Sequence, residues 1–263
     1  MIKNTNFKGD KLYYTIKGEG KVIMLLHGFL ESSETWGAFA EELSKSFKVI
    51  IPDLPGHGKS GLSLNKLQMK YMAASVEAIL EREAIKKAFV VGHSMGGYVA
   101  CAFAQQFNER LSGLCLLHSH PFGDSQEKKA DRNAAVKLLE ADENSKIEIC
   151  RNHAPKVFAG DNVLKFKTEI EQGLQIALNT DIKTIQATLR GMRDRSDRSQ
   201  IIENLAIPFL YVQGVGDNFI PLDTMTKELM PPKGQIMTLK NAGHMGFIEE
   251  PEPLLDYFIE HYK

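Results

Sequence analysis

Residues 88–104 read Ala-Phe-Val-Val-Gly-His-Ser-Met-Gly-Gly-Tyr-Val-Ala-Cys-Ala-Phe-Ala, and this stretch decides the fold. Its centre, residues 92–96, has the pattern Gly-x-Ser-x-Gly. The apolar run before it predicts a buried strand, and the small residues after it predict a helix. Such a setting is typical of a nucleophile elbow, in which strained backbone holds a serine out at the end of a strand. The sequence therefore predicts a nucleophile at Ser94; the alternative is an ordinary strand-to-helix turn that contains a serine.

Further blocks occur in order along the chain. Residues 26–29 read Leu-His-Gly-Phe, residues 53–60 read Asp-Leu-Pro-Gly-His-Gly-Lys-Ser, and a late Gly-x-x-Asp-x-x-x-Pro at 214–221 precedes Gly-His at 243–244. Together with the elbow, they resemble the α/β-hydrolase superfamily, specifically its small, lid-bearing serine esterases, lactonases and carbon–carbon bond hydrolases. The resemblance covers nearly the whole chain. It implies an α/β-hydrolase fold: a mostly parallel sheet of about eight strands with helices on both faces and a helical cap insertion.

The pattern of apolar runs agrees with a parallel sheet. Strands are predicted at 11–16, 22–26, 48–51, 89–91, 114–117, 208–212 and 235–239. Most are continuous apolar runs, which indicate burial on both faces. Helices are predicted between them, at about 35–46, 65–83, 96–107, 222–230 and 252–262.

The segment between residues 117 and 208 carries no strand signal. It contains amphipathic helices, one with its apolar stripe from Ile182 to Met192 and another with its stripe from Val163 to Ala177. Because a helix must lay its apolar stripe on something, we expect a helical cap over the carboxyl edge of the sheet. The predicted division is a cap of residues 121–204 inserted into a core of residues 1–120 and 205–263.

The cap leads to two narrower expectations. Its stripes predict an apolar roof above Ser94 with few fixed charges, which would favour uncharged acyl groups of modest length. Residues 193–198, Arg-Asp-Arg-Ser-Asp-Arg, alternate in charge and predict a solvated junction where the cap rejoins the core.

The candidate catalytic residues follow the predicted strands. A serine hydroxyl needs a neighbouring base, and His244 is the candidate because the family places its histidine after the last strand. Asp217 follows strand 208–212 and would fix the tautomer of that histidine. The order Ser94, Asp217, His244 is the one expected of this fold. Asp124, after the preceding strand, is the alternative acid, because some family members place the acid there.

The remaining motifs concern the surroundings of the serine. By the resemblance, the backbone N–H groups of Phe29 and Met95 would form the oxyanion hole. Residues 53–60 lack the spacing of a phosphate loop and are predicted to form a structural turn. His118 and His120 follow a strand into the cap and could line the pocket, but no nearby cluster of acids or histidines supports a metal site. We predict neither a metal nor a cofactor.

Composition limits the class of protein. The chain has 263 residues, 43% of them hydrophobic, and a formal net charge of -1, which does not favour a nucleic-acid partner. Residues 1–10 lack the apolar run of a signal peptide, and no stretch has the length of a membrane span. We therefore expect a cytoplasmic protein that acts on a small molecule, without a membrane partner; a homodimer is left open.

The leading interpretation is a cofactor-free serine hydrolase that cleaves a small-molecule ester through an acyl-enzyme, with thioesters and lactones as related substrates. Among these reactions, hydrolysis of a carboxylic ester is the preferred interpretation. A serine nucleophile argues against relatives that use aspartate or cysteine instead. The alternatives are a carbon–carbon bond hydrolase, a perhydrolase or a lyase on the same triad, or a ligand-binding sensor on the hydrolase fold.

Overall fold

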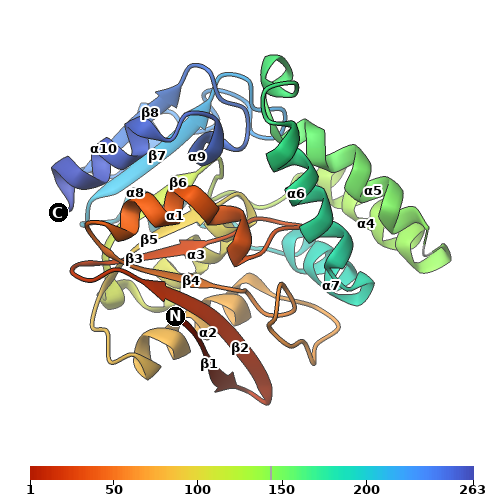
Figure 1. The fold of residues 1–263 in the computed structure, drawn as a ribbon, viewed down its shortest axis with the longest axis horizontal. Coiled ribbons are helices and arrows are strands. Elements are labelled where there is room, and N and C mark those ends of the chain that lie inside the picture. Colours follow the sequence, from red (N-terminus) through yellow and green to blue (C-terminus); the bar gives the residue numbers. More distant parts are fainter. Residues whose placement is uncertain (143) are drawn as a thin grey trace.

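The computed structural model describes residues 1–142 and 144–263, and in them one eight-stranded sheet has the order β1-β2-β4-β3-β5-β6-β7-β8 (Figure 1). The strands are β1 (Ile2–Phe7), β2 (Asp10–Lys17), β3 (Val22–Leu26), β4 (Lys48–Pro52), β5 (Ala88–His93), β6 (Leu111–Leu117), β7 (Phe209–Gly214) and β8 (Gly234–Leu239). β2 runs antiparallel to β1 and β4, and all other neighbours are parallel. The predicted fold class is confirmed.

Helices cover both faces of the sheet. They are α1 (Gly37–Ser44), α9 (Gly246–Glu249) and α10 (Glu252–His261) on one face, and α2 (Met69–Arg82) and α3 (Met95–Gln106) on the other. In β3 the pleat sends Ile23 and Leu25 to the first face and Met24 and Leu26 to the second. All four side chains are fully buried, as the continuous apolar run predicts.

The structure differs from the prediction in two elements. The sequence prediction missed β1, because this edge strand alternates between exposed and half-buried residues and has no buried apolar run. The predicted helix at 222–230 is wrong, since only the short 3₁₀ helix η5 (Lys227–Leu229) forms there. Asp223 has φ +61°, in the left-handed region that interrupts a right-handed helix.

Between β6 and β7 the chain forms helices. They are α4 (Gln126–Ala141), α5 (Ser145–His153), the 3₁₀ turns η3 (Ala154–Val157) and η4 (Gly160–Asn162), α6 (Lys167–Asn179), α7 (Ile182–Arg193) and α8 (Ser199–Glu203). Figure 1 shows α4 to α7 gathered at one side of the sheet. α8 instead packs on α3, with Ile202 fully buried. The division into core and cap stays a prediction. Among the described residues, no helix is long and apolar enough to cross a membrane.

The predicted solvated junction at 193–198 is wrong for its two later arginines. Arg195 and Arg198 are buried. The Arg195 guanidinium lies 3.8 Å from the centroid of the Tyr98 ring and donates a 3.0 Å hydrogen bond from Nε to the carbonyl oxygen of Phe122. Arg198 donates from Nε to the side-chain oxygen of Gln105 at 3.0 Å. These charges therefore anchor the insertion to the core.

Candidate active site

Ser94 lies between β5 and α3 with φ +50° and ψ −114°, a backbone conformation that L residues rarely adopt. Hydrogen bonds hold it there. Its N–H donates to the carbonyl oxygen of Leu117 at 3.0 Å, and its own carbonyl oxygen accepts from Gly97 N at 2.9 Å and Ser119 Oγ at 2.7 Å. Strain of this kind persists where the surroundings over-determine it and is typical of functional sites.

The glycines beside Ser94 permit a close approach of three elements. A Cβ on Gly92 would lie 2.4 Å from the carbonyl oxygen of Gly96, and a Cβ on Gly96 would lie 2.2 Å from that of Leu26. Both obstacles are backbone atoms. Only glycine therefore lets β5, α3 and β3 meet under Ser94.

Asp217 and His244 form a buried pair at the carboxyl edge of the sheet. The distance from His244 Nδ1 to Asp217 Oδ2 is 2.8 Å, and the other carboxylate oxygen accepts from the backbone N–H groups of Phe219 at 2.8 Å and Ile220 at 3.0 Å. Burial opposes ionisation of Asp217, but the charge of His244 and hydrogen bonds from two histidines hold its pKa far below its usual range. His244 and Ser94 line the same cavity, of about 300 Å³.

His118 is a second histidine on Asp217, and sequence reasoning gave it no such role. Its Nδ1 lies 3.2 Å from Asp217 Oδ2, and its Nε2 accepts from Gly246 N at 3.2 Å. The carboxylate can only accept and the backbone N–H can only donate, so His118 is the neutral tautomer with its proton on Nδ1. Burial is the largest cause that lowers the pKa of His118 to about 4. Its place directly after β6, between the strands that carry the other residues, was the available signal.

His118, Asp217 and His244 together have the composition of a metal-binding group. Their ligand atoms lie within 4.8 Å of one another. However, both Nδ1 atoms donate to the same Asp217 oxygen, and the second carboxylate oxygen is occupied by two backbone N–H groups. These hydrogen bonds use the atoms that a metal would need, so the arrangement favours orientation of His244 rather than metal binding.

Of the two residues predicted to supply the oxyanion donors, Phe29 lines the Ser94 cavity and Met95 directly follows Ser94. Met95 is the first residue of α3, so its N–H has no acceptor within the helix. Phe29 lines the cavity with Ser94 and is followed by Leu30, whose φ of +61° turns the chain sharply. The N–H of Gly28 donates to Glu31 Oε2 at 2.7 Å, which folds the segment 28–31 onto itself.

A buried ion pair joins three segments of the site, and sequence reasoning missed both members. His93 Nδ1 lies 3.1 Å from Glu31 Oε2, and His93 Nε2 lies 2.8 Å from the carbonyl oxygen of His244. Both partners can only accept, so both ring nitrogens carry protons and His93 is an imidazolium. The pair therefore ties the segment 28–31, the elbow and the loop of His244 together.

The pKa values of this pair agree with its charged form. Burial opposes the charge of each group, but mutual attraction and hydrogen bonds outweigh it. The pKa of Glu31 is lowered to about 2, and that of His93 is raised.

Residues 53–60 form a turn that supports the same region. The Asp53 carboxylate accepts from Ser33 N and Lys59 N, each at 2.9 Å. His27 Nε2 accepts from Leu54 N at 3.0 Å, while His27 Nδ1 lies 2.9 Å from the carbonyl oxygen of Gly28. His27 thereby fastens this turn to the segment that carries Phe29.

Asp124, the alternative acid, is engaged elsewhere. Its carboxylate pairs with Arg132 and Arg195, and the Arg195 side chain is only 2% exposed. Burial opposes ionisation of Asp124, but the two guanidinium groups lower its pKa. The structure therefore pairs His244 with Asp217 and not with Asp124.

The predicted apolar roof over Ser94 is wrong in part. Leu189 and Met192 of α7 do line the cavity, but besides the paired Glu31 so do four further charged side chains, those of Asp124, Lys128, Asp131 and Arg132. These come from α4 and the segment before it. The stripe on α6 lines a different cavity, through Ile170 and Ala177.

Comparisons with known proteins agree with this architecture. The sequence profile of the alpha/beta hydrolase fold matches residues 21–140. An esterase structure from the thermophile Thermogutta terrifontis is similar, with a TM-score of 0.89 and 28% identity over 98% of this chain and 96% of that one. A pimeloyl-[acyl-carrier protein] methyl ester esterase from Edwardsiella ictaluri is 26% identical over 92% of this chain and 93% of its own.

A further relative is longer than this chain. The dihydrolipoyllysine-residue acetyltransferase component of the acetoin cleaving system from Cupriavidus necator is 28% identical over 92% of this chain, which spans 64% of that protein's length. The profile match, the structural likeness and the strand–elbow–helix unit together show that the chain has the α/β-hydrolase fold and that its relatives are enzymes of the α/β-hydrolase superfamily.

Proposed function

We propose that the protein is a serine hydrolase that cleaves a small-molecule carboxylic ester through an acyl-enzyme. Ser94 is the nucleophile, His244 the base and Asp217 the acid that orients it. The observation that carries this proposal is the 2.8 Å contact between His244 and Asp217, in the cavity region where Ser94 emerges from a strained elbow. The names of the esterase relatives support the same reaction class.

The hydrogen bond to Asp217 distinguishes the two ring nitrogens of His244 and supports a different role for each. Its Nδ1–H is held by Asp217, so Nε2 is the nitrogen available to take the Ser94 proton during attack on the ester carbonyl. The carbonyl oxygen gains negative charge, which the N–H groups of Phe29 and Met95 stabilise. His244 then returns the proton to the leaving alcohol. Water, activated by the same nitrogen, releases the acid and restores Ser94.

Turnover of p-nitrophenyl butyrate tests this proposal against a non-catalytic sensor. Wild type should release p-nitrophenol, and Ser94→Ala should lose about 10⁴-fold or more of kcat while keeping its fold. Ser112→Ala is the matched control. It removes a hydroxyl from β6 that hydrogen-bonds Tyr262 at 2.7 Å, outside the cavity. Equal turnover by wild type and Ser94→Ala would contradict the proposal.

A further inference from the structure

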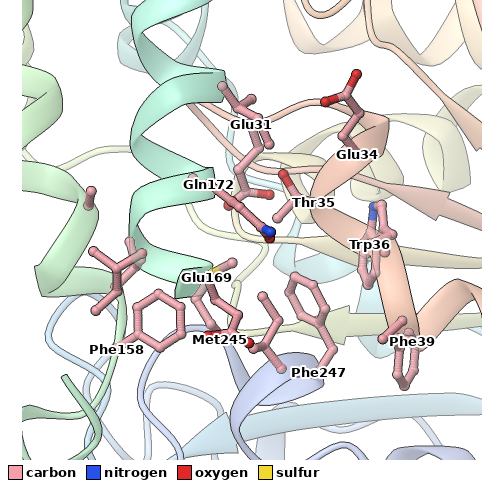
Figure 2. Close-up of a pocket in the computed structure, with 18 of the residues that line it drawn as sticks. Glu31, Glu34, Thr35, Trp36, Phe39, Phe158, Glu169, Gln172, Met245 and Phe247 are labelled. Atoms are coloured by element: carbon pink, nitrogen blue, oxygen red, sulfur yellow. The ribbon is translucent and has the colours of Figure 1, made fainter. Parts of the chain in front are cut away.

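A second cavity, of about 560 Å³, lies beside the one that contains Ser94. We call it the distal cavity. Its walls come from the segment 29–42, which ends within α1, from the end of α5 with η3, from α6, and from α9 with the start of α10. Figure 2 shows aromatic rings on opposite sides, Phe158 on one and Trp36, Phe39 and Phe247 on the other. Its size is within the range of pockets that hold small molecules.

The two cavities are adjacent. Phe29, Glu31 and His153 line both of them. The rings of Phe29 and His153 meet edge to face, with centroids 6.1 Å apart, and form the boundary between the two spaces. Phe29 is the residue whose backbone N–H we assign to the oxyanion hole. A group that extends past this boundary from the ester carbonyl therefore enters the distal cavity.

The charges of the distal cavity select what can enter. Its walls are mainly apolar, and its charged residues are acidic: besides the paired Glu31, they are Glu34, Glu42, Glu169 and Glu252. No lysine or arginine lines it among the residues that the structure describes. A chain with a terminal carboxylate would lose hydration there and meet like charge. An uncharged apolar chain would gain free energy from burial.

We propose that the distal cavity binds a long, uncharged apolar chain of the ester, whose carbonyl sits at Ser94. This inference rests on the proposed function and names its substrate class. The cavity over Ser94 itself carries five charged side chains, basic ones among them, and is the smaller of the two. The polar part of the substrate stays there, and the apolar part crosses the boundary formed by Phe29 and His153.

Gly173 offers a clean way to fill the distal cavity. It lies on α6, lines the cavity, and a Cβ placed on it meets no atom within 4 Å. Gly173→Leu therefore adds a side chain at the cavity wall whose Cβ has open space around it, and it replaces glycine by a better helix former. Gly160→Leu is the matched control, because Gly160 is exposed in η4, has equally open space and does not line the cavity.

The experiment measures kcat/KM along two ester series. One lengthens the acyl arm as p-nitrophenyl acetate, butyrate, octanoate and dodecanoate; the other lengthens the alcohol arm as alkyl butyrates. In wild type, lengthening one of the two arms should raise kcat/KM by up to about fourfold per methylene until the distal cavity is full. Gly173→Leu should lower kcat/KM for the long esters of that series by about tenfold or more, because two or more methylenes are no longer buried. Acetate should be unaffected, and Gly160→Leu should match wild type throughout.

The outcomes separate this inference from the proposed function. If wild type hydrolyses acetate but both series are the same in Gly173→Leu and wild type, the distal cavity does not bind the substrate. If wild type turns over no ester, the proposed function fails first. Melting temperatures check that each variant folds. Ile176 of α6 also lines the distal cavity, so Ile176→Trp is a second way to fill the cavity if Gly173→Leu folds poorly.

A charge reversal tests the preference of the distal cavity for an uncharged chain over a carboxylated one. Wild type should prefer p-nitrophenyl octanoate over the mono-p-nitrophenyl ester of octanedioic acid by at least about tenfold, because the second chain carries a carboxylate into an acidic wall. Glu169→Lys should narrow that ratio. A wild type that prefers the carboxylated chain, or a ratio unchanged in Glu169→Lys, would overturn the assignment of an uncharged chain.

Discussion

The two candidate acids should respond in opposite ways to the same substitution. In Asp217→Asn the amide can present an N–H where the carboxylate accepted the Nδ1–H of His244 at 2.8 Å. The imidazole then favours the tautomer with its proton on Nε2, which cannot take the Ser94 proton. The expected loss in kcat is about 10⁴-fold, the typical value for an acid in this role.

Asp124→Asn should instead damage stability. It removes the counter-charge of Arg132 and of Arg195, whose side chain is 2% exposed. An uncompensated buried guanidinium costs about 3–5 kcal/mol, which lowers the melting temperature of a chain of this size by roughly 6 °C or more. Its kcat on p-nitrophenyl butyrate should stay within about tenfold of wild type, because Asp124 does not contact His244.

One assay of turnover and one thermal melt on the two variants decide between the acids. The account requires a large loss of kcat in Asp217→Asn with a smaller change in melting temperature, and the reverse in Asp124→Asn. If Asp124→Asn were the crippling change and Asp217→Asn mild, the assignment of the acid would be wrong.

Further predictions concern the framework of the site. Glu31→Gln should lower the free energy of unfolding by about 3 kcal/mol or more, because it leaves the His93 imidazolium buried without its counter-charge. The difference in unfolding free energy between wild type and variant should be largest between pH 4.5 and 6.5, the unperturbed pKa values of the two groups. It should shrink as wild-type Glu31 becomes protonated toward pH 2, and it should also shrink above pH 6.5 as wild-type His93 loses its proton. Urea unfolding across pH measures it, and a difference independent of pH would refute the ion pair. Gly96→Ala should cost about 3 kcal/mol, because its Cβ would lie 2.2 Å from a backbone oxygen, whereas Gly173→Ala, in open space on a helix, should be neutral or stabilising; equal melting temperatures for the two would contradict the close packing under Ser94.

The fold was predictable because its decisive features are local. Continuous apolar runs mark the central strands, and the strand–glycine–serine–glycine–helix unit fixes the elbow. The ends of parallel strands meet at one edge, so Ser94, Asp217 and His244, each following a different strand, could be expected near one another. The structure places all three at that edge.

The contacts that complete the site could not be predicted in this way. The pair of Glu31 and His93 joins residues 62 positions apart, and the bond of His118 to Asp217 spans 99. The local sequence of His93 does not distinguish it from a solvated histidine, and the position of His118 directly after β6 does not reveal which residue it contacts. The charged wall of the Ser94 cavity likewise depends on how α4 is placed, which an apolar stripe on α7 does not reveal.

Covalent labelling of Ser94 tests the central claim most directly. Wild type treated with a fluorophosphonate should gain the mass of one phosphonyl group, and peptide mapping should place it on Ser94. Ser94→Ala should gain none, and Ser112→Ala should label like wild type. A Ser94→Ala protein that labels as fully as wild type, or a label mapped to another residue, would contradict the account of Ser94 as the nucleophile.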